Sequence, residues 1–351
     1  MPAVPAPRHA FDFLRPPCMV CGVPPPGGPH CRAPGLVPTL PDVRDSMVND
    51  ELIDAAERGD TAALVQLDAA GLFPGADESL TDYAQRLRCL RRNFSRMDEE
   101  LRQAGVFTVE GVTVRADARI PDALFAEALE DTERLYAFRI DWVPGFFINP
   151  RFSLLFGGCA FYFYPDFFAL FIVRRVFARR SHWLIYSRRE LLAHELCHVA
   201  RIALGSRRYE EMFAYQTATS PFRRLAGSIF RSQAEAFWFL GSTLGLLAAQ
   251  MLQTVALPWW PVWPFWGAVV GVVLWLVLHL TRLGRLRDRA LEHAEWLAPG
   301  RGRSLLFRCS DDEVDAIAGL PSREAALAWF EACCQAQPRW RVIRERFASR
   351  A

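Results

Sequence analysis

Apolar residues recur at helical spacing in the first and last parts of the chain. The stretch "DELIDAAERGDTAALVQLDAAGLF", which follows Asn49, predicts two short amphipathic helices that break at Gly59-Asp60. The pair looks like the helices of a single ankyrin repeat. One repeat cannot bury its own apolar face, so we interpret the pair as a helical hairpin. The same spacing predicts later helices over residues 79–103, over 121–138 with Pro121 at the start, from a Ser310–Glu313 capping box, and over 322–335.

Between these helices the pattern is that of β-strands. The stretch "VFTVEGVTVRADARI" predicts a hairpin that turns at Glu110-Gly111. The stretch "CAFYFYPDFFALFIVRRVF" is apolar and aromatic, but Pro165-Asp166 interrupts it, and neither half is long enough to cross a bilayer as a helix. We therefore predict two strands joined by a tight turn. A third strand is predicted in "HWLIYS" (182–187), running directly into the next helix.

Two later stretches are apolar throughout. The first, Ala236 to Leu257, has 22 residues without a charge, and the second, Trp259 to Thr281, has 23 residues, so each can cross a bilayer as a helix. The short connection "PWWPVWP" makes the two a hairpin, with tryptophans suited to a membrane interface. The alternative is a buried hairpin in a soluble core, but a soluble helix usually keeps a polar face. By the positive-inside rule, both ends of the hairpin face the cytoplasm, because arginines flank it: Arg223, Arg224, Arg231, Arg282, Arg285 and Arg287.

The composition agrees with a membrane protein. Hydrophobic residues make up 51% of the 351 residues, and 26 Phe and 11 Trp are high counts for a soluble chain. The formal net charge of +2 gives no reason to expect a nucleic-acid partner. Nine cysteines are an odd number in a chain too large to need disulfides, which favours a reducing compartment. The N-terminus "MPAVPAPRHAFDF" lacks the pattern of a signal peptide.

The stretch "YSRRELLAHELCHVARIALG" (186–205) carries the strongest chemical signal. Ser187 and Glu190 have the spacing of a capping box, and Gly205 supplies a left-handed stop. The predicted helix therefore covers residues 188–204.

Residues 194–198 of this helix read H-E-x-x-H. His194 and His198 are four residues apart, so both imidazoles project from one face and can bind zinc together. Glu195 lies beside them, where it can take a proton from a metal-bound water. Two histidines and a carboxylate in an otherwise apolar helix are costly to bury unless they are paired or bound to metal, which favours a Zn2+ site. The alternative is a pair of hydrogen-bonded core histidines beside a buried acid.

A catalytic zinc needs a third protein ligand. The metzincin spacing, H-E-x-x-H-x-x-G-x-x-H, is absent, because Arg201 and Leu204 stand where it needs Gly and His. In "GSRRYEEMFAY" a new helix is predicted after the glycine turn, with Glu210 or Glu211 in its first turn and able to point back. We prefer Glu211, because small Ala214 follows where the two helices would pack closely. Glu210 stays open as the alternative, and a further interpretation is that both acids simply favour the helix N-terminus.

A strand, an H-E-x-x-H helix and a glutamate on the following helix resemble the gluzincin metallopeptidases. With a transmembrane hairpin beside them, residues 180–290 are similar to the membrane proteases related to HtpX and to the CAAX prenyl proteases. The resemblance implies that the two histidines and Glu211 bind zinc and that Glu195 is the general base. The chain departs from those families in that Tyr215 replaces the Asp of E-x-x-A-D and both spans follow the third ligand.

Such a site would hydrolyse a protein or peptide substrate. Zinc lowers the pKa of its water and stabilises the oxyanion, while Glu195 takes the proton and passes it to the leaving amine. Tyr215 and His293 are candidates for a second electrophile. The strand Phe168 to Arg174 is expected to be the edge that pairs with an extended substrate. Cys159 is either a buried thiol or a ligand that reaches the zinc and holds the enzyme latent.

The sequence thus predicts an α+β protein, mostly helical, with a small antiparallel sheet packed on the H-E-x-x-H helix and a two-helix transmembrane hairpin. The predicted function is a zinc endopeptidase in the inner, cytoplasmic membrane, with the catalytic core and both termini in the cytoplasm. The alternatives are a membrane scaffold or binding protein with a structural or vestigial metal site, and a metal-dependent hydrolase of another bond. Retention of Glu195 favours the enzyme.

Five segments are predicted. They are a disordered Pro/Gly-rich tail (1–46), a helical N-terminal region (47–150), the metallopeptidase core (151–235), the transmembrane hairpin (236–282) and a cytoplasmic helical region (283–351). In the tail, Cys18-x-x-Cys21 with His30 and Cys31 is either a small zinc knuckle or part of a flexible segment.

Overall fold

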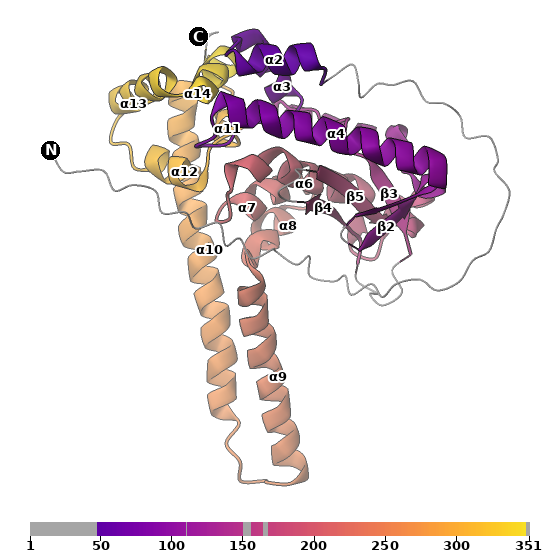
Figure 1. Cartoon of the computed structure of the whole chain (residues 1–351). Helices are drawn as coiled ribbons and strands as arrows, with labels where there is room; N and C mark the ends of the chain where they lie inside the picture. The colour runs from indigo at the N-terminus through magenta and orange to yellow at the C-terminus, as the bar shows by residue number, and fades with distance from the viewer. Residues whose placement is uncertain (1–47, 110, 150–155, 164–167, 349–351) are drawn as a thin grey trace.

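The computed structural model describes residues 48–109, 111–149, 156–163 and 168–348 (Figure 1). The predicted tail with its Cys18, Cys21, His30 and Cys31 group, and the predicted turn at Pro165-Asp166, lie outside the described residues. Within them the protein is mostly helical with small sheets, in agreement with the α+β class. Two of its helices are long and apolar enough to cross a membrane.

The N-terminal helices form where the apolar spacing predicts them. Helices α2 (Asp50–Glu57) and α3 (Thr61–Ala69) are separated at Gly59-Asp60, and α4 (Leu80–Ala104) follows. The α2–α3 pair buries its apolar face because α4 contacts α2 and the C-terminal helix α14 (Pro338–Ile343) contacts α3. Helices α4 and α14 therefore cover the apolar face that neighbouring repeats would cover in a repeat array.

Helix α5 begins later than predicted. A 3-10 turn, Asp122–Leu124, follows Pro121, and α5 itself covers Ala126–Tyr136. Pro121 is therefore the residue before a helical turn rather than the first residue of the helix. The hairpin before it is confirmed, since β1 (Val106–Val109) and β2 (Val112–Arg115) pair antiparallel.

The main sheet is mixed. Its strands β3 (Gly145–Ile148), β4 (Gly158–Phe163) and β5 (Phe168–Arg174) lie in the order β3-β5-β4. Strand β5 is antiparallel to β4 and parallel to β3. The prediction of an antiparallel sheet is thus wrong for one pair, and the prediction that Phe168–Arg174 is an edge is wrong, because β3 pairs with its other side. The unbroken burial of β5 from Phe168 to Val173 is typical of a central strand.

The predicted strand 182–187 is instead a very small hairpin. Strands β6 (His182–Trp183) and β7 (Tyr186–Ser187) pair antiparallel, with Leu184 at a φ of +50° in the turn between them. Leu184 and Ile185 are therefore turned outward and exposed, at 63% and 74%.

A buried charge cluster joins the N-terminal helices to the C-terminal ones. The carboxylate of Asp68 in α3 accepts hydrogen bonds from Arg308 at 2.8 and 2.9 Å and pairs with Arg346. Arg308 also donates to the carbonyl oxygens of Tyr136 and Ser304. The side chains of Asp68 and Arg308 are 4% and 1% exposed, so each charge depends on the other for its stability.

Removal of the Asp68 charge is expected to destabilise the folded chain. In Asp68→Asn the buried Arg308 guanidinium loses its counter-ion, which costs about 3 kcal/mol of the free energy of unfolding. Urea unfolding in mild detergent, followed by circular dichroism, measures the loss. Asp54→Asn, which removes a half-exposed partner of Arg88, is the matched control and should have a much smaller effect. Equal stability of the two variants would contradict the role of the cluster.

Helices α9 (Gln233–Val255) and α10 (Trp263–Leu297) form a long hairpin that projects from the rest of the molecule (Figure 1). Only 11% of the most apolar 18-residue stretch of each helix is buried, whereas a core helix of a soluble protein is mostly buried. The second helix begins at Trp263 rather than Trp259, and Pro264 lies in its first turn, where a missing N–H costs nothing. The two predicted apolar helices are confirmed, with a slightly longer turn between them.

Helix α10 does not end with the apolar stretch. It continues without a break to Leu297, so the predicted segment boundary after residue 282 falls inside one helix. Its last turns contact α11 (Gly302–Leu306), α12 (Asp311–Ala318) and α13 (Arg323–Ala336). The capping box of Ser310 and Glu313 at the start of α12 is confirmed. Helix α14 and the π-helical turn after it, Arg344–Ala348, were not predicted.

Candidate metal centre

The H-E-x-x-H residues lie on helix α6 (Arg188–Arg201). Its N-cap is Ser187, as predicted, but among the described residues the Ser187 side chain makes no capping hydrogen bond. Glu190 does not reach back either. Its carboxylate accepts the backbone N–H of Thr219 at 2.7 Å and the Thr219 hydroxyl, and it pairs with Arg223. The predicted capping box is wrong, because these three donors from a distant segment outweigh one helix N–H.

The end of α6 turns the chain back toward the histidines. A 3-10 turn, Ile202–Leu204, is followed by Gly205 at a φ of +62°, which confirms the left-handed stop. A residue with a side chain is strained in this conformation. The next helix, α7 (Glu210–Ala214), then contacts α6, which places both acidic residues of its first turn near the motif.

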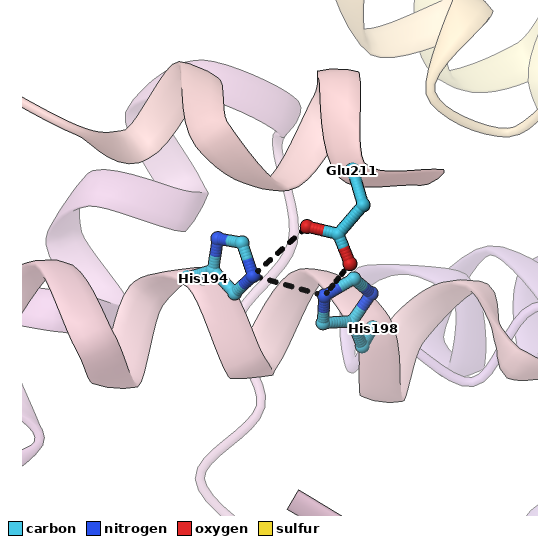
Figure 2. Close-up of side chains that lie close together, drawn as sticks. All are labelled: His194, His198 and Glu211. Atoms are coloured by element: carbon cyan, nitrogen blue, oxygen red, sulfur yellow. Dashed lines mark hydrogen bonds and ion pairs between the residues drawn. The ribbon is translucent and has the colours of Figure 1, made fainter. Parts of the chain in front are cut away.

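Three side chains from α6 and α7 converge (Figure 2). The Nε2 atoms of His194 and His198 are 3.1 Å apart. Glu211 places Oε2 3.5 Å from Nε2 of His194 and Oε1 3.6 Å from Nε2 of His198. The two histidine side chains are 16% exposed and that of Glu211 is 29% exposed, so solvent reaches the group.

These separations suit a tetrahedral metal. Zinc holds nitrogen and carboxylate oxygen at about 2.0–2.1 Å, which gives a tetrahedron with edges of about 3.3–3.4 Å. The two nitrogens lie 3.1 Å apart, and Glu211 places one oxygen 3.5 Å from His194 and the other 3.6 Å from His198, so its carboxylate faces both possible ligands. Borderline nitrogen ligands with one hard oxygen are also the donor types that zinc accepts.

Glu210 has a different position from Glu211. Its Oε1 accepts the Nδ1–H of His198 at 3.1 Å, and its Oε2 accepts the Nε–H of Arg201 at 2.7 Å. A carboxylate on the second nitrogen of a histidine fixes the ring orientation and leaves Nε2 for a metal. Of the two acids between which the sequence left a choice, the structure therefore brings Glu211 to the donor group and puts Glu210 behind His198.

Arg201 completes this support. It is 1% exposed, and besides Glu210 it donates to Ser206 and to the carbonyl oxygen of Phe307 while its guanidinium lies 4.4 Å from the ring of Phe213. The sequence showed Arg201 only as a departure from the metzincin spacing. Its ion pair with Glu210 depends on how α7 turns back onto α6, and its partner Phe307 is 106 residues away, so neither gave a local signal.

The two histidines have opposite pKa shifts. Burial, followed by the neighbouring His198, lowers the pKa of His194 well below its ordinary value. Burial also acts to lower the pKa of His198, but the hydrogen bond that its Nδ1–H donates to Glu210 and the charges of Glu211, Glu210 and Glu195 outweigh it and raise the pKa to about 9. At neutral pH the metal-free site therefore has a protonated His198 that donates its Nε2–H to a neutral His194.

Zinc binding at neutral pH is expected to release about one proton per site, because His198 must give up its Nε2 proton to become a ligand. Calorimetric titration in two buffers with different ionisation enthalpies measures this number. Since the His198 pKa is about 9, the release should shrink as the pH rises through that value. Zinc binding without proton release at neutral pH would show that His198 carries no extra proton in the metal-free site.

Glu195 lies beside the donor group and is held by the sheet. Its Oε2 accepts the backbone N–H of Ala160 in β4 at 2.8 Å. Burial raises the pKa of Glu195 to about 7, the range in which a general base works best at neutral pH. Ala160 was missed by the sequence analysis, because it contributes a backbone N–H whose position depends on how β4 lies against α6.

Tyr215 also reaches the site, and His293 does not. The Tyr215 ring centroid lies 4.6 Å from that of His194, at an angle of 68°. His293 is buried on α10, where its Nδ1 lies 2.7 Å from the carbonyl oxygen of Ile317 and its ring stacks on Trp296. The structure thus keeps one of the two candidates for a second electrophile near the donor group.

Cys159 faces away from this centre. It is buried in a cluster with Phe107 and Ile172, whereas the next residue, Ala160, belongs to the core cluster that includes α6. Adjacent residues of a strand point to opposite faces. The position is that of a buried thiol, the first of the two interpretations, and not that of a zinc ligand.

Comparisons of the chain with protein-family models, with curated proteins and with solved structures gave no match. The chemistry of the site therefore has to be inferred from its own geometry.

Proposed function

We propose that the protein is a membrane-anchored zinc-dependent endopeptidase. The observation that carries the proposal is the convergence of three donors, from His194, His198 and Glu211, within 4.8 Å of one another and beside the half-buried carboxylate of Glu195. A structural zinc site takes four protein ligands, whereas catalytic sites with two histidines and a glutamate leave the fourth position open. A group of three donors with a base beside it has the composition of a catalytic site.

The roles of the side chains follow from their positions. A bound zinc ion would supply Lewis-acid chemistry toward a water molecule and a substrate carbonyl. Glu195 takes the proton of the attacking water and returns it to the leaving amine, for which a pKa of about 7 is suitable. Burial raises the pKa of Tyr215, so its hydroxyl stays protonated and can donate a hydrogen bond to the carbonyl oxygen as negative charge develops there.

The substrate is an extended peptide that pairs with β4. Within the described sheet β4 is an outer strand, with β5 on its other side. The N–H of Ala160 points away from β5, since it donates to Glu195, and so the outer edge of β4 faces the catalytic side chains. Strand addition at this edge would carry a peptide bond past Glu195 and the donor group. This edge replaces β5, which the sequence analysis had chosen.

The anchor is the α9–α10 hairpin. Its exposed apolar surface and two spans of sufficient length support insertion into a bilayer. Trp259 and Trp263, 74% and 76% exposed at the turn, suit the far interface. By the positive-inside rule, the flanking arginines support a cytoplasmic position of the catalytic core and of both termini.

The first test is the metal content and peptidase activity of the full chain purified in detergent. About one zinc per chain is expected, together with hydrolysis of peptides from a broad fluorogenic library. Folded protein that binds no zinc would contradict the proposal. Stoichiometric zinc without hydrolysis of any peptide or protein offered would favour the structural-site alternative.

A further inference from the structure

Four exposed apolar side chains gather outside the hairpin. Leu184 and Ile185 in the β6–β7 turn are 63% and 74% exposed, and Phe222 and Leu225 of helix α8 (Pro221–Ala226) are 75% and 70% exposed. We call these four residues the apolar collar. A single exposed apolar side chain of this size is common on protein surfaces. A group of them from two segments instead marks an interaction surface.

The two segments of the collar are held together. Arg223 of α8 pairs with Glu190 of α6 and donates to the carbonyl oxygen of Ile185 at 3.5 Å. Arg224 donates to the carbonyl oxygens of Ala218 and Thr219. The polar side chains of α8 are thus engaged with the protein, while its two large apolar side chains are directed outward.

The collar lies where the hairpin leaves the catalytic core. Helix α9 begins soon after α8, and the exposed apolar surface continues through Phe230, which is 37% exposed, to Phe237 and Trp238, which are 62% and 68% exposed. The apolar surface of the collar is therefore continuous along the chain with that of the proposed membrane anchor.

The three metal donors lie close to the part of α10 where its apolar stretch ends. At the end of the apolar part of α10, Arg282 and Arg285 are exposed, as expected for side chains among lipid headgroups. Between them, Gly284 lies against Met212, with 3.7 Å from the methyl carbon to the position of a glycine Cβ. Met212 follows Glu211 directly. The third donor is thus one residue away from a contact with the headgroup-level part of α10.

A second contact joins the start of the hairpin to the site. Gly227, in the 3-10 turn Gly227–Ile229 that precedes α9, lies so close to Tyr215 that a Cβ would come within 2.2 Å of its ring. Only glycine permits this approach. The ring of Tyr215 in turn lies against His194.

We propose that the apolar collar inserts into the interfacial layer of the leaflet that α9 and α10 enter, so that the metal centre opens at the membrane surface. The occupant of the collar is the bilayer itself, because the apolar surface continues into the anchor and the basic residues of α10 mark the same level. The polypeptides that suit the site are membrane-bound ones, cleaved in an extended segment next to the bilayer. This substrate class rests on the proposed peptidase function, whereas the insertion of the collar rests only on the membrane anchor.

Photo-crosslinking tests the collar without any need for activity. Benzoylphenylalanine is placed at Phe222, Leu225 or Ile185 of the full chain, which is reconstituted into phosphatidylcholine–phosphatidylglycerol vesicles. Lipid adducts found by mass spectrometry are expected at all three positions. Trp238 on α9 is the positive control, and Leu327, exposed at 45% on α13, is the matched control without adducts.

Each other result overturns the proposal. Adducts at Trp238 but not in the collar would show an anchored protein whose collar stays in water. Adducts to protein in place of lipid would show a protein-docking surface. No adduct at Trp238 would remove the anchor itself, and with it the membrane part of the proposed function.

A peptidase assay tests the substrate class. The double substitution Phe222→Ser/Leu225→Ser is expected to slow cleavage of a lipid-tethered peptide by about tenfold or more, because the site no longer lies against the surface. Cleavage of the same peptide free in solution should stay within about twofold. Equal losses on both peptides would show that the collar only stabilises the fold. If wild type cleaves neither peptide, the peptidase function fails, while the crosslinking still decides the position of the collar.

Discussion

The substitution Glu195→Gln is expected to lower kcat/KM for peptide hydrolysis by about 100-fold to 10,000-fold, the range for loss of a general base. An amide of the same shape cannot take a proton from water, but its oxygen can still accept the N–H of Ala160, now 2.8 Å from the carboxylate. The fold and the donor group should therefore be preserved, with zinc content unchanged. Initial rates on a fluorogenic peptide, beside zinc content by mass spectrometry, measure both quantities on one preparation.

The matched control is Glu99→Gln, which changes an exposed acid paired with Arg102 on α4 and should leave the rate unaltered. Because the two variants are purified in the same way, activity that survives in Glu195→Gln would reveal either a contaminating protease or a base elsewhere in the chain. Undiminished activity that copurifies with the zinc of the Glu195→Gln protein would rule out the assigned role.

The second large effect distinguishes the two neighbouring acids. Glu211→Ala removes a donor from a group of three and should abolish stoichiometric zinc binding. Glu210→Gln keeps the three donors but weakens the hydrogen bond at Nδ1 of His198, so zinc affinity should fall by about 10- to 100-fold, as is typical when a carboxylate that orients a metal-binding histidine is lost. Competition with a chromophoric chelator measures both affinities.

Arg201 complicates the Glu210 variant, because the single change leaves a buried guanidinium without its counter-ion. The double substitution Arg201→Met/Glu210→Gln removes both charges and is the better test where the single variant unfolds. The reverse order, with zinc lost from Glu210→Gln and kept in Glu211→Ala, would make Glu210 the ligand and contradict the arrangement in Figure 2.

The parts of the site that the sequence predicted are those set by local periodicity. The four-residue spacing of His194 and His198 fixes their common face wherever a helix forms. Gly205 marks the end of that helix because its positive φ is unfavourable for other residues. The preference for Glu211 over Glu210 rested on the position of Ala214, and the contact between α6 and α7 agrees with close packing there.

The parts that were missed depend on distant segments. Glu190 fits a capping box locally, but its carboxylate is taken by Thr219 and Arg223. The central position of β5 depends on β3, a strand of four residues that pairs in parallel from an earlier part of the chain. Pairing of this kind has no signal in local patterning, since any apolar segment of the right length would fit beside β5.

The unbroken length of α10 has a mechanical consequence. A helix of 35 residues is about 52 Å long, whereas the hydrocarbon core of a bilayer is about 30 Å thick. With the apolar part in a bilayer, the remaining length would stand outside it as a rigid rod, against Met212 at Gly284 and against α11 and α12 further on. A bilayer of different thickness changes the tilt of such a helix. Because α10 continues without a break to its contact with Met212, the residue after Glu211, hydrophobic mismatch would act on the geometry of the three donors, and for the proposed peptidase membrane thickness would become a variable of activity.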